Sequence, residues 1–301
     1  MSITEKKELK FRLKDGNCRL QAVRDNIIKC SFTKKEEWTD ESPIGICCSS
    51  EADFTAEEDG KKVKIRTGQI ILEADCTGGT FCWRDAADEH VLLREGRKEL
   101  TEAPYMVYNT GDEAPVIHRV QTVDGERNFV KNLRAVEDHK AYHGKLCFLW
   151  EPDEHIHGLG QGEEGIYDYR GNVQYLYQHN MRIPIPFFVS DKGYGILVDC
   201  GSLMYFNDDC RGSWLYLDMV EQLDYYFIKG DSLDEIIAGY RLLTGKAVML
   251  PKWAFGYVQS KEAYLTQEEM EETAEKYREL DIPLDCLVQD WNTWEAGKWG
   301  N

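Results

Sequence analysis

Polar and aromatic residues follow an apolar run near the C-terminal end of the sequence. The run LDCLVQD ends in Asp290, and Trp291 and Trp294 come shortly after it. A carboxylate accepts hydrogen bonds from sugar hydroxyls, and a flat indole ring covers the C–H face of a pyranose. These residue types favour a sugar-binding site. The alternative is that the two indoles pack beneath a helix that Asp290 caps.

A second stretch, residues 155–188, is rich in glycine, tyrosine and polar side chains before it enters an apolar run. It is typical of a binding loop, or of an inter-strand loop packed by its own tyrosines. Glu154, His155 and His157 are metal-ligand types, but such a trio is common by chance, and we expect no metal. The HGLGQG segment lacks a following helix and is not a phosphate loop, so no cofactor is expected.

Catalytic groups are harder to find by spacing. Hydrolysis of a glycosidic bond needs two carboxylates on either side of that bond, but most of the 54 acidic residues are expected on the solvated surface, and no pair stands out. No G-x-S-x-G sequence occurs. Cys286 lies inside an apolar run, which favours a core position over a nucleophile.

Composition limits the partners. The chain has 301 residues, 42% of them hydrophobic, and a formal net charge of −18. This charge argues against nucleic acid and against an anionic membrane surface, whereas a neutral sugar is compatible with it. Ten cysteines without a C-x-x-C pair indicate free thiols in a reducing compartment. The first residues show no secretory signal and no apolar run is long enough to span a membrane, so we expect a cytoplasmic protein.

Residues 1–230 are typical of an all-β domain. Short alternating runs such as KKVKIRT and QIILEAD recur between turn signals, placing Val63 with Ile65, and Ile70 with Leu72, on one face of a strand. Many strands without intervening helices favour a β-sandwich, with a barrel as the alternative.

The pattern changes after Gly230. Ser232 and Glu235 form the signature of a capped helix, followed by apolar residues at helical spacing up to a stop at Gly245. A strand, a helix that begins after Thr266 with Met270, Ala274 and Tyr277 as its buried stripe, and a second strand complete a βαβ unit.

We therefore predict three regions: a sandwich over 1–230, a helical connector over 231–252 and the start of a (β/α)8 barrel over 253–301. A full barrel takes roughly 250 residues, and one βαβ unit does not cover its own strands. The exposed apolar surface that results predicts self-association.

Several segments, taken together, resemble glycoside hydrolase family 31, the α-glucosidases and α-xylosidases. The segments occur in the family's order: HGLGQGEEG with YRGN, IPIPFFVSDKGYGILVD, SLDEIIAGYRLLTGKAVMLPKWAFGYVQSKEAYLTQEEMEETAEKYRELDIPLD, and VQDWNTW with KWG. The resemblance implies a galactose-mutarotase-like sandwich followed by a (β/α)8 barrel. It also implies that Asp290 binds hydroxyls of the sugar at the cleavage site. A sandwich loop reaching over that site would correspond to 167–172, with Asp168 and Tyr169 as substrate-binding candidates.

The resemblance also implies a limit. The family's nucleophile and its acid/base are aspartates after the fourth and sixth barrel strands, and these strands have no counterpart in this sequence. We expect this chain to contribute contacts to an α-linked oligosaccharide or glycoside in a retaining reaction, but to be inactive alone. The alternatives are a non-catalytic carbohydrate-binding or assembly module, and a mutarotase-like epimerase that uses His155, His157 or His179.

Overall fold

The computed structural model of the chain describes residues 4–39, 45–49, 51–122 and 125–294. The chain groups into two compact units. The first comprises Met1–Met106 and Glu137–Lys246, and the second comprises Val107–Val136 and Ala247–Asn301. No helix in the described ranges is long and apolar enough to cross a bilayer.

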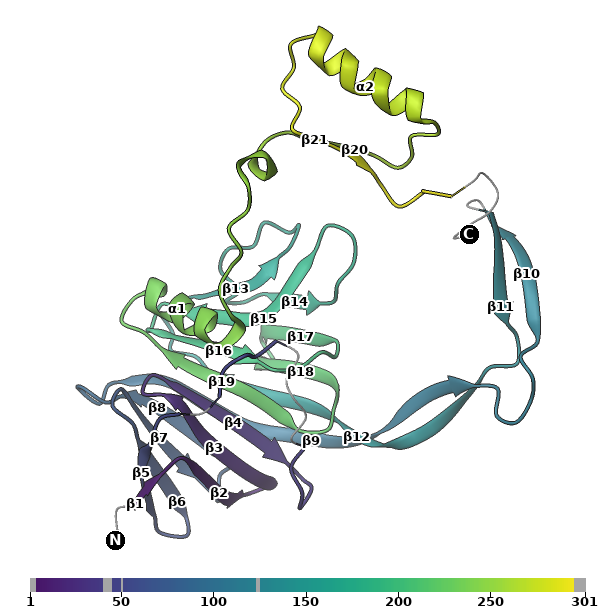
Figure 1. Cartoon of the computed structure of the whole chain (residues 1–301). Coiled ribbons are helices and arrows are strands. Elements are labelled where there is room, and N and C mark those ends of the chain that lie inside the picture. Colours follow the sequence, from purple (N-terminus) through teal and green to yellow (C-terminus); the bar gives the residue numbers. More distant parts are fainter. Residues whose placement is uncertain (1–3, 40–44, 50, 123–124, 295–301) are drawn as a thin grey trace. The chain divides into compact units, whose positions relative to one another are not determined.

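The first unit is built from two antiparallel sheets (Figure 1). The larger sheet contains, in spatial order, β1 (Thr4–Lys6), β5 (Phe54–Glu58), β6 (Lys62–Arg66), β7 (Ile70–Asp75), β8 (Thr80–Asp85), β9 (Val91–Asn109), β12 (Arg134–Leu149), β18 (Gly212–Val220), β17 (Met204–Asp209) and β14 (Val173–Leu176). The smaller sheet contains β13 (Ile156–Gln161), β15 (Ile183–Ser190), β16 (Tyr194–Val198), β19 (Leu223–Lys229), β4 (Ile27–Thr33), β3 (Gly16–Arg24) and β2 (Glu8–Leu13).

The core lies between these sheets. The alternation read from the sequence is confirmed, because Val63, Ile65, Ile70 and Leu72 are all buried. Trp83 of β8 stacks on Phe227 of β19 with ring centroids 4.1 Å apart and planes 2° apart. Since β8 and β19 belong to different sheets, this contact joins the two layers. The fold is therefore the predicted sandwich and not the alternative barrel.

A charged pair is also buried in this core. The side chains of Glu95 and Lys98 are both fully inaccessible, and Lys98 Nζ donates to Glu95 Oε2 over 2.7 Å. Trp83 Nε1 donates to Glu95 Oε1 over 2.5 Å, and Tyr225 OH donates to Oε2 over 2.6 Å. The ammonium group lies 3.5 Å from the centre of the Phe81 ring. Both charges are thus paired and hydrogen-bonded, as burial requires.

Helix α1 (Leu233–Thr244) packs on β16 and β19. Ser232 Oγ accepts from Glu235 N over 3.3 Å, which confirms the predicted cap. Ile236 and Leu243 are buried, whereas Leu233 remains 58% exposed. The helix thus packs against the sandwich inside the region predicted as a connector, and the first unit extends to Lys246.

The second unit contains a βαβ segment and a hairpin. A 3-10 turn, η1 (Lys252–Phe255), precedes the βαβ segment. Strands β20 (Val258–Lys261) and β21 (Cys286–Gln289) pair in parallel, and helix α2 (Gln267–Glu279) connects them. The hairpin pairs β10 (Ile117–Thr122) with β11 (Gly125–Val130).

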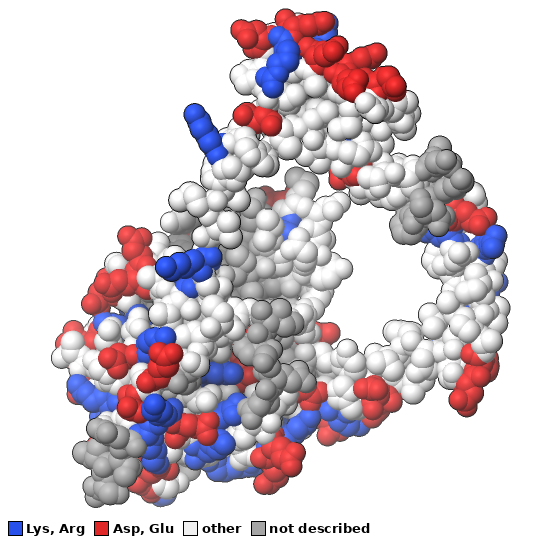
Figure 2. Space-filling model, in the orientation of Figure 1, with Lys and Arg blue, Asp and Glu red and all other residues white. Residues whose placement is uncertain are grey.

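Helix α2 differs from the prediction in its packing. Thr266 caps it as expected, because its hydroxyl accepts from Glu269 N over 3.2 Å. However, no residue of the helix is buried, and the stripe formed by Met270, Ala274 and Tyr277 is only half-buried. Two strands cover too little of an amphipathic helix to bury its apolar stripe. Figure 2 shows acidic side chains along the helix's outer surface.

Candidate sugar-binding site

Asp290 directly follows β21 at the carboxyl edge of the parallel strand pair. Gln289 is in register with Lys261 at the end of β20, and Asp290 N donates to Lys261 O over 3.3 Å. Asp290 is exposed. Barrel enzymes build their active sites at this edge of the strands. Asp290 thus lies at the predicted strand end, and its binding of sugar hydroxyls stays a prediction.

Gln289 holds together the loops that follow the two strands. Its Oε1 accepts from Tyr264 N over 2.8 Å, and its Nε2 donates to Asn292 O over 2.9 Å. Trp291 and Trp294 meet edge to face with centroids 5.2 Å apart, and Trp291 is 45% exposed. The positioning role of Gln289 was not predicted, although a polar residue at the last position of an apolar strand is a signal for it. The KWG sequence at 298–300 lies outside the described residues.

In the first unit, Asp168 fixes the loop between β13 and β14. Its Oδ2 bonds to His155 Nδ1 over 2.6 Å, while Oδ1 accepts from Ile156 N and Arg170 N over 3.1 and 3.0 Å. Burial alone would raise the pKa of Asp168, but these hydrogen bonds outweigh it and lower the pKa. The hydrogen bond from Asp168 raises the pKa of His155. Both carboxylate oxygens thus have partners within the protein.

Tyr169 and Tyr167 of the same loop point to different environments. Tyr169 is 5% exposed and its ring meets Phe206 edge to face at 6.0 Å. Burial raises the pKa of its phenol. Tyr167 is 81% exposed, and its carbonyl oxygen lies 2.7 Å from His157 Nδ1. A cavity of about 360 Å³ is lined by both tyrosines and by the glycines of the HGLGQG segment. Asp168 and Tyr169 therefore have visible structural contacts, and their contact with substrate stays a prediction.

The trio considered as metal ligands is not arranged around one point. Glu154 is buried and accepts from Ser190 Oγ and Tyr194 OH over 2.6 and 2.5 Å, whereas His155 bonds to Asp168 and His157 to a backbone carbonyl. Each potential ligand is therefore engaged by a different protein group.

Another trio, Asp85, Asp88 and His90, has ligand atoms within 4.8 Å of one another. Lys229 Nζ lies 3.1 Å from the Asp85 carboxylate, and His90 Nδ1 lies 2.5 Å from Asp88. These contacts account for the closeness of the three side chains without a metal.

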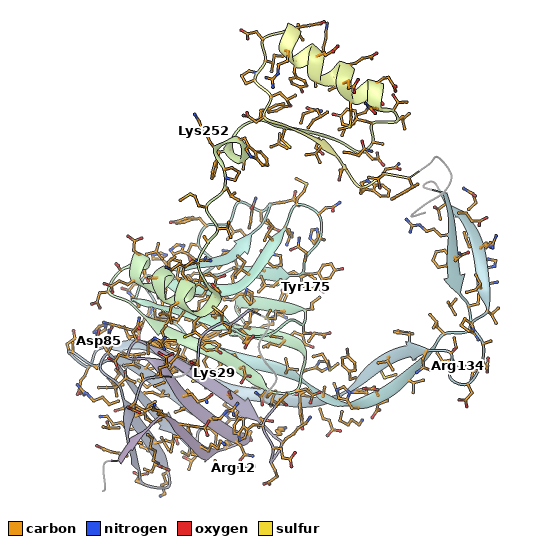
Figure 3. The ribbon with its side chains drawn as sticks, viewed as in Figure 1. Arg12, Lys29, Asp85, Arg134, Tyr175 and Lys252 are labelled. Carbon is orange, nitrogen blue, oxygen red and sulfur yellow. The ribbon has the colours of Figure 1, made fainter. Side chains whose placement is uncertain are left out.

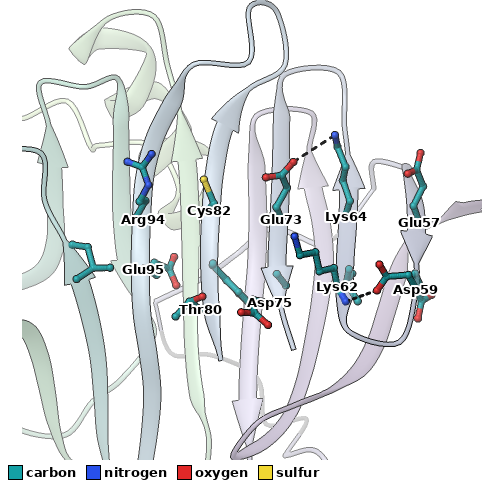
Figure 4. Close-up of a pocket in the computed structure, with 15 residues that line it drawn as sticks. Glu57, Asp59, Lys62, Lys64, Glu73, Asp75, Thr80, Cys82, Arg94 and Glu95 are labelled. Carbon is teal, nitrogen blue, oxygen red and sulfur yellow. Dashed lines mark hydrogen bonds and ion pairs between the residues drawn. The ribbon is translucent and has the colours of Figure 1, made fainter. Parts of the chain in front are cut away.

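A pocket of about 460 Å³ lies on the larger sheet across β5 to β9 (Figure 4). Two of its charged side chains pair with each other, Lys64 Nζ with Glu73 Oε1 at 3.6 Å. None of the residues predicted for the sugar site lines it. The one aromatic ring in its lining, Phe81, is only 2% exposed, so the pocket offers no open aromatic platform for a sugar.

Comparison with known proteins shows similarity to glycosidases. Residues 247–301 match the model described as the glycosyl hydrolases family 31 TIM-barrel domain. An α-xylosidase of Saccharolobus solfataricus is 42% identical over 179 residues, which cover 56% of this chain and 24% of that protein. This chain is thus similar to a family 31 barrel domain over residues 247–301, and to an α-xylosidase over 179 residues. The chain spans about a quarter of the length of that α-xylosidase.

Solved structures of family 31 members share the fold. An α-xylosidase from Xanthomonas citri superposes with a TM-score of 0.77 at 18% identity, covering 98% of this chain and 46% of the other. A family 31 α-xylosidase from a soil metagenome, solved in complex with xylose, gives a TM-score of 0.71 at 22% identity, with 98% and 42% coverage. This chain thus shares the fold of part of each of these two structures.

Proposed function

We propose that this chain supplies the sandwich and the first barrel strands of a retaining α-glycosidase that acts on α-xylosides or α-glucosides. The observation that carries the proposal is Asp290, an exposed carboxylate at the carboxyl edge of β20 and β21 beside the exposed ring of Trp291. The segment that contains it matches the family 31 barrel.

The residues of this edge have complementary roles. Asp290 accepts hydrogen bonds from sugar hydroxyls, while Trp291 and Trp294 cover the apolar face of the ring. Asp168 and Tyr169 are the proposed substrate contacts of the sandwich loop, and the exposed ring of Tyr167 lies next to them in the chain. The carboxylates that break the bond correspond to positions after the fourth and sixth barrel strands of the family.

The 301-residue chain is expected to show no hydrolysis of aryl α-xylosides or α-glucosides. A missing general acid alone costs roughly 10²–10⁴-fold in rate, and a missing nucleophile removes the covalent intermediate as well.

In titration calorimetry, Asp290→Asn should weaken binding of xylose or glucose about tenfold, the loss of one charge-assisted hydrogen bond. Glu279→Gln, an exposed carboxylate in the same unit, is the matched control. If the 301-residue chain hydrolyses these substrates robustly and Asp290→Ala abolishes that activity, the catalytic residues lie within this chain and the proposal is wrong.

A second function, an assembly module, is favoured by exposed apolar side chains in the second unit. Leu265 is 84% exposed, Phe255 74% and Trp253 53%, and such exposure promotes association. We expect light scattering on the 301-residue chain to give a mass that rises with concentration. The Phe255→Glu and Leu265→Glu variants should return it toward the monomer. A wild-type chain that stays monomeric at all concentrations contradicts the assembly role.

All ten cysteines are free thiols. This supports the proposed cytoplasmic location, because a reducing compartment keeps thiols free.

A further inference from the structure

Aromatic side chains form a cross-strand row on the outer face of the larger sheet, near its β14 edge. Tyr175 of β14 is the register partner of Tyr205 of β17, and Tyr205 is the partner of Tyr216 of β18. Partners in an antiparallel pair point to the same side of the sheet. The ring centroids of Tyr175 and Tyr205 accordingly lie 6.1 Å apart. Figure 3 shows Tyr175 projecting from this edge.

Two further rings widen the row. Tyr177 lies 6.3 Å from Tyr175, and Trp214 lies two residues before Tyr216 on the same face of β18. The ammonium of Lys145 lies 4.2 Å from the Trp214 ring centre. Together the five rings define the aromatic face: Tyr175, Tyr177, Tyr205, Trp214 and Tyr216.

The core does not need these rings. The alternate residues of the same strands point inward and are buried: Leu176, Met204, Phe206, Leu215 and Leu217. Meanwhile Tyr175 is 47% exposed and Tyr177 52% exposed. The other three rings are partly exposed. A contiguous exposed patch of large apolar groups marks an interaction surface.

Hydrogen-bonding groups border the aromatic face. Tyr216 OH lies 3.0 Å from His143 Nδ1 and donates to Asp218 Oδ1 over 3.2 Å. Lys145 and Asp218 bring one charge of each sign to this border. The arrangement is flat and apolar in the middle, polar at the rim, and without excess charge.

We propose that the aromatic face binds a neutral polysaccharide by stacking on its pyranose rings, with the bordering groups bonding its hydroxyls. This inference rests on the proposed function, since it places a sugar chain on a protein that acts on glycosides. The apolar C–H faces of a pyranose complement the aromatic rings of this surface, and its hydroxyls complement the polar groups that border the rings. A polyanion is disfavoured by the net charge of −18.

The test is native affinity electrophoresis of the 301-residue chain in gels that contain xyloglucan or dextran. We expect the polysaccharide to retard the wild-type chain. The double variant Tyr175→Ala with Tyr205→Ala should weaken the apparent affinity at least about tenfold, while Tyr175→Phe, which keeps the ring, should retain it. Tyr108→Ala removes a tyrosine that is 71% exposed and lies outside the aromatic face, and serves as the control. Circular dichroism checks that each variant is folded.

The outcomes separate this inference from the proposed function. Asp290→Ala measures separately what the Asp290 site contributes to retardation, and the loss caused by the tyrosine pair should exceed that contribution. If Asp290→Ala abolishes retardation and the tyrosine pair does not, the aromatic face is excluded and the proposed function stands. Absence of wild-type retardation, or an equal loss with Tyr108→Ala, overturns the inference. The inference is also overturned if the double variant Tyr175→Ala with Tyr205→Ala changes the oligomeric state but not the retardation.

Discussion

Lys98→Met is expected to lower the free energy of unfolding of the sandwich unit by about 3–5 kcal/mol, as removal of one partner from a buried ion pair does. The substitution keeps most of the side-chain volume but removes the ammonium group that lies 2.7 Å from Glu95. The Glu95 carboxylate then stays buried with neutral donors only, from Trp83 and Tyr225. Urea unfolding followed by circular dichroism measures the loss.

A second variant tests whether the loss comes from the uncompensated charge. The double variant Glu95→Gln with Lys98→Met has no buried charge. An amide at position 95 still offers an oxygen to Trp83 Nε1 and an N–H to the Tyr225 hydroxyl. We expect the double variant to recover at least half of the stability lost in Lys98→Met, since neutral replacements of buried pairs are often well tolerated.

The control is an ion pair on the same sheet that faces solvent. Lys64 and Glu73 lie 3.6 Å apart with side chains 40% and 41% exposed (Figure 4). Lys64→Met should therefore change the free energy of unfolding by less than about 1 kcal/mol. Equal losses for Lys64→Met and Lys98→Met, or a double variant no better than the single one, would contradict the role assigned to the buried charge.

The buried pair also shows why the sequence predicted the sandwich but not its interior charges. Alternation predicted that Val63 and Ile65 would be buried, because an antiparallel strand with one solvated face alternates in polarity. Glu95 and Lys98 stand among Arg94 and Arg97 in one charged stretch of β9. Only the distant partners Trp83 and Tyr225 make burial tolerable, and local spacing carries no information about them.

In the candidate site, too, some features follow from local sequence pattern and others depend on tertiary neighbours. The position of Asp290 followed from local pattern, because a polar residue at the end of an apolar strand lies at the carboxyl edge wherever that strand pairs in parallel. The structural contacts of Asp168 and Tyr169 did not follow from local pattern. Both are set by tertiary neighbours, His155 and Phe206, which lie 13 and 37 positions away in the sequence. Composition alone therefore identified the loop and not which of its tyrosines faces solvent.

Gly160→Ala is the second substitution with a large expected effect. Gly160 has a φ of +88°, and a Cβ there would lie 2.0 Å from Ile183 O and 2.6 Å from Ile185 N. These atoms are backbone of β15, with which β13 pairs, so no side-chain rotation relieves the overlap. We expect a loss of more than about 3 kcal/mol, from overpacking together with left-handed strain. Urea unfolding gives the total, and hydrogen exchange at the His157 and Gln161 amides shows whether β13 separates from β15.

Gly165→Ala separates the two causes within the same loop region. Gly165 also has a left-handed φ, +67°, but a Cβ there would meet nothing within 4 Å. It should therefore cost only about 1 kcal/mol, the strain of the backbone conformation alone. If Gly160→Ala costs no more than Gly165→Ala, the close approach of β13 to β15 does not constrain the chain. If Gly160→Ala costs more than Gly165→Ala, the HGLGQG segment needs glycine at position 160. The backbone of β15 then occupies the space that a side chain would fill.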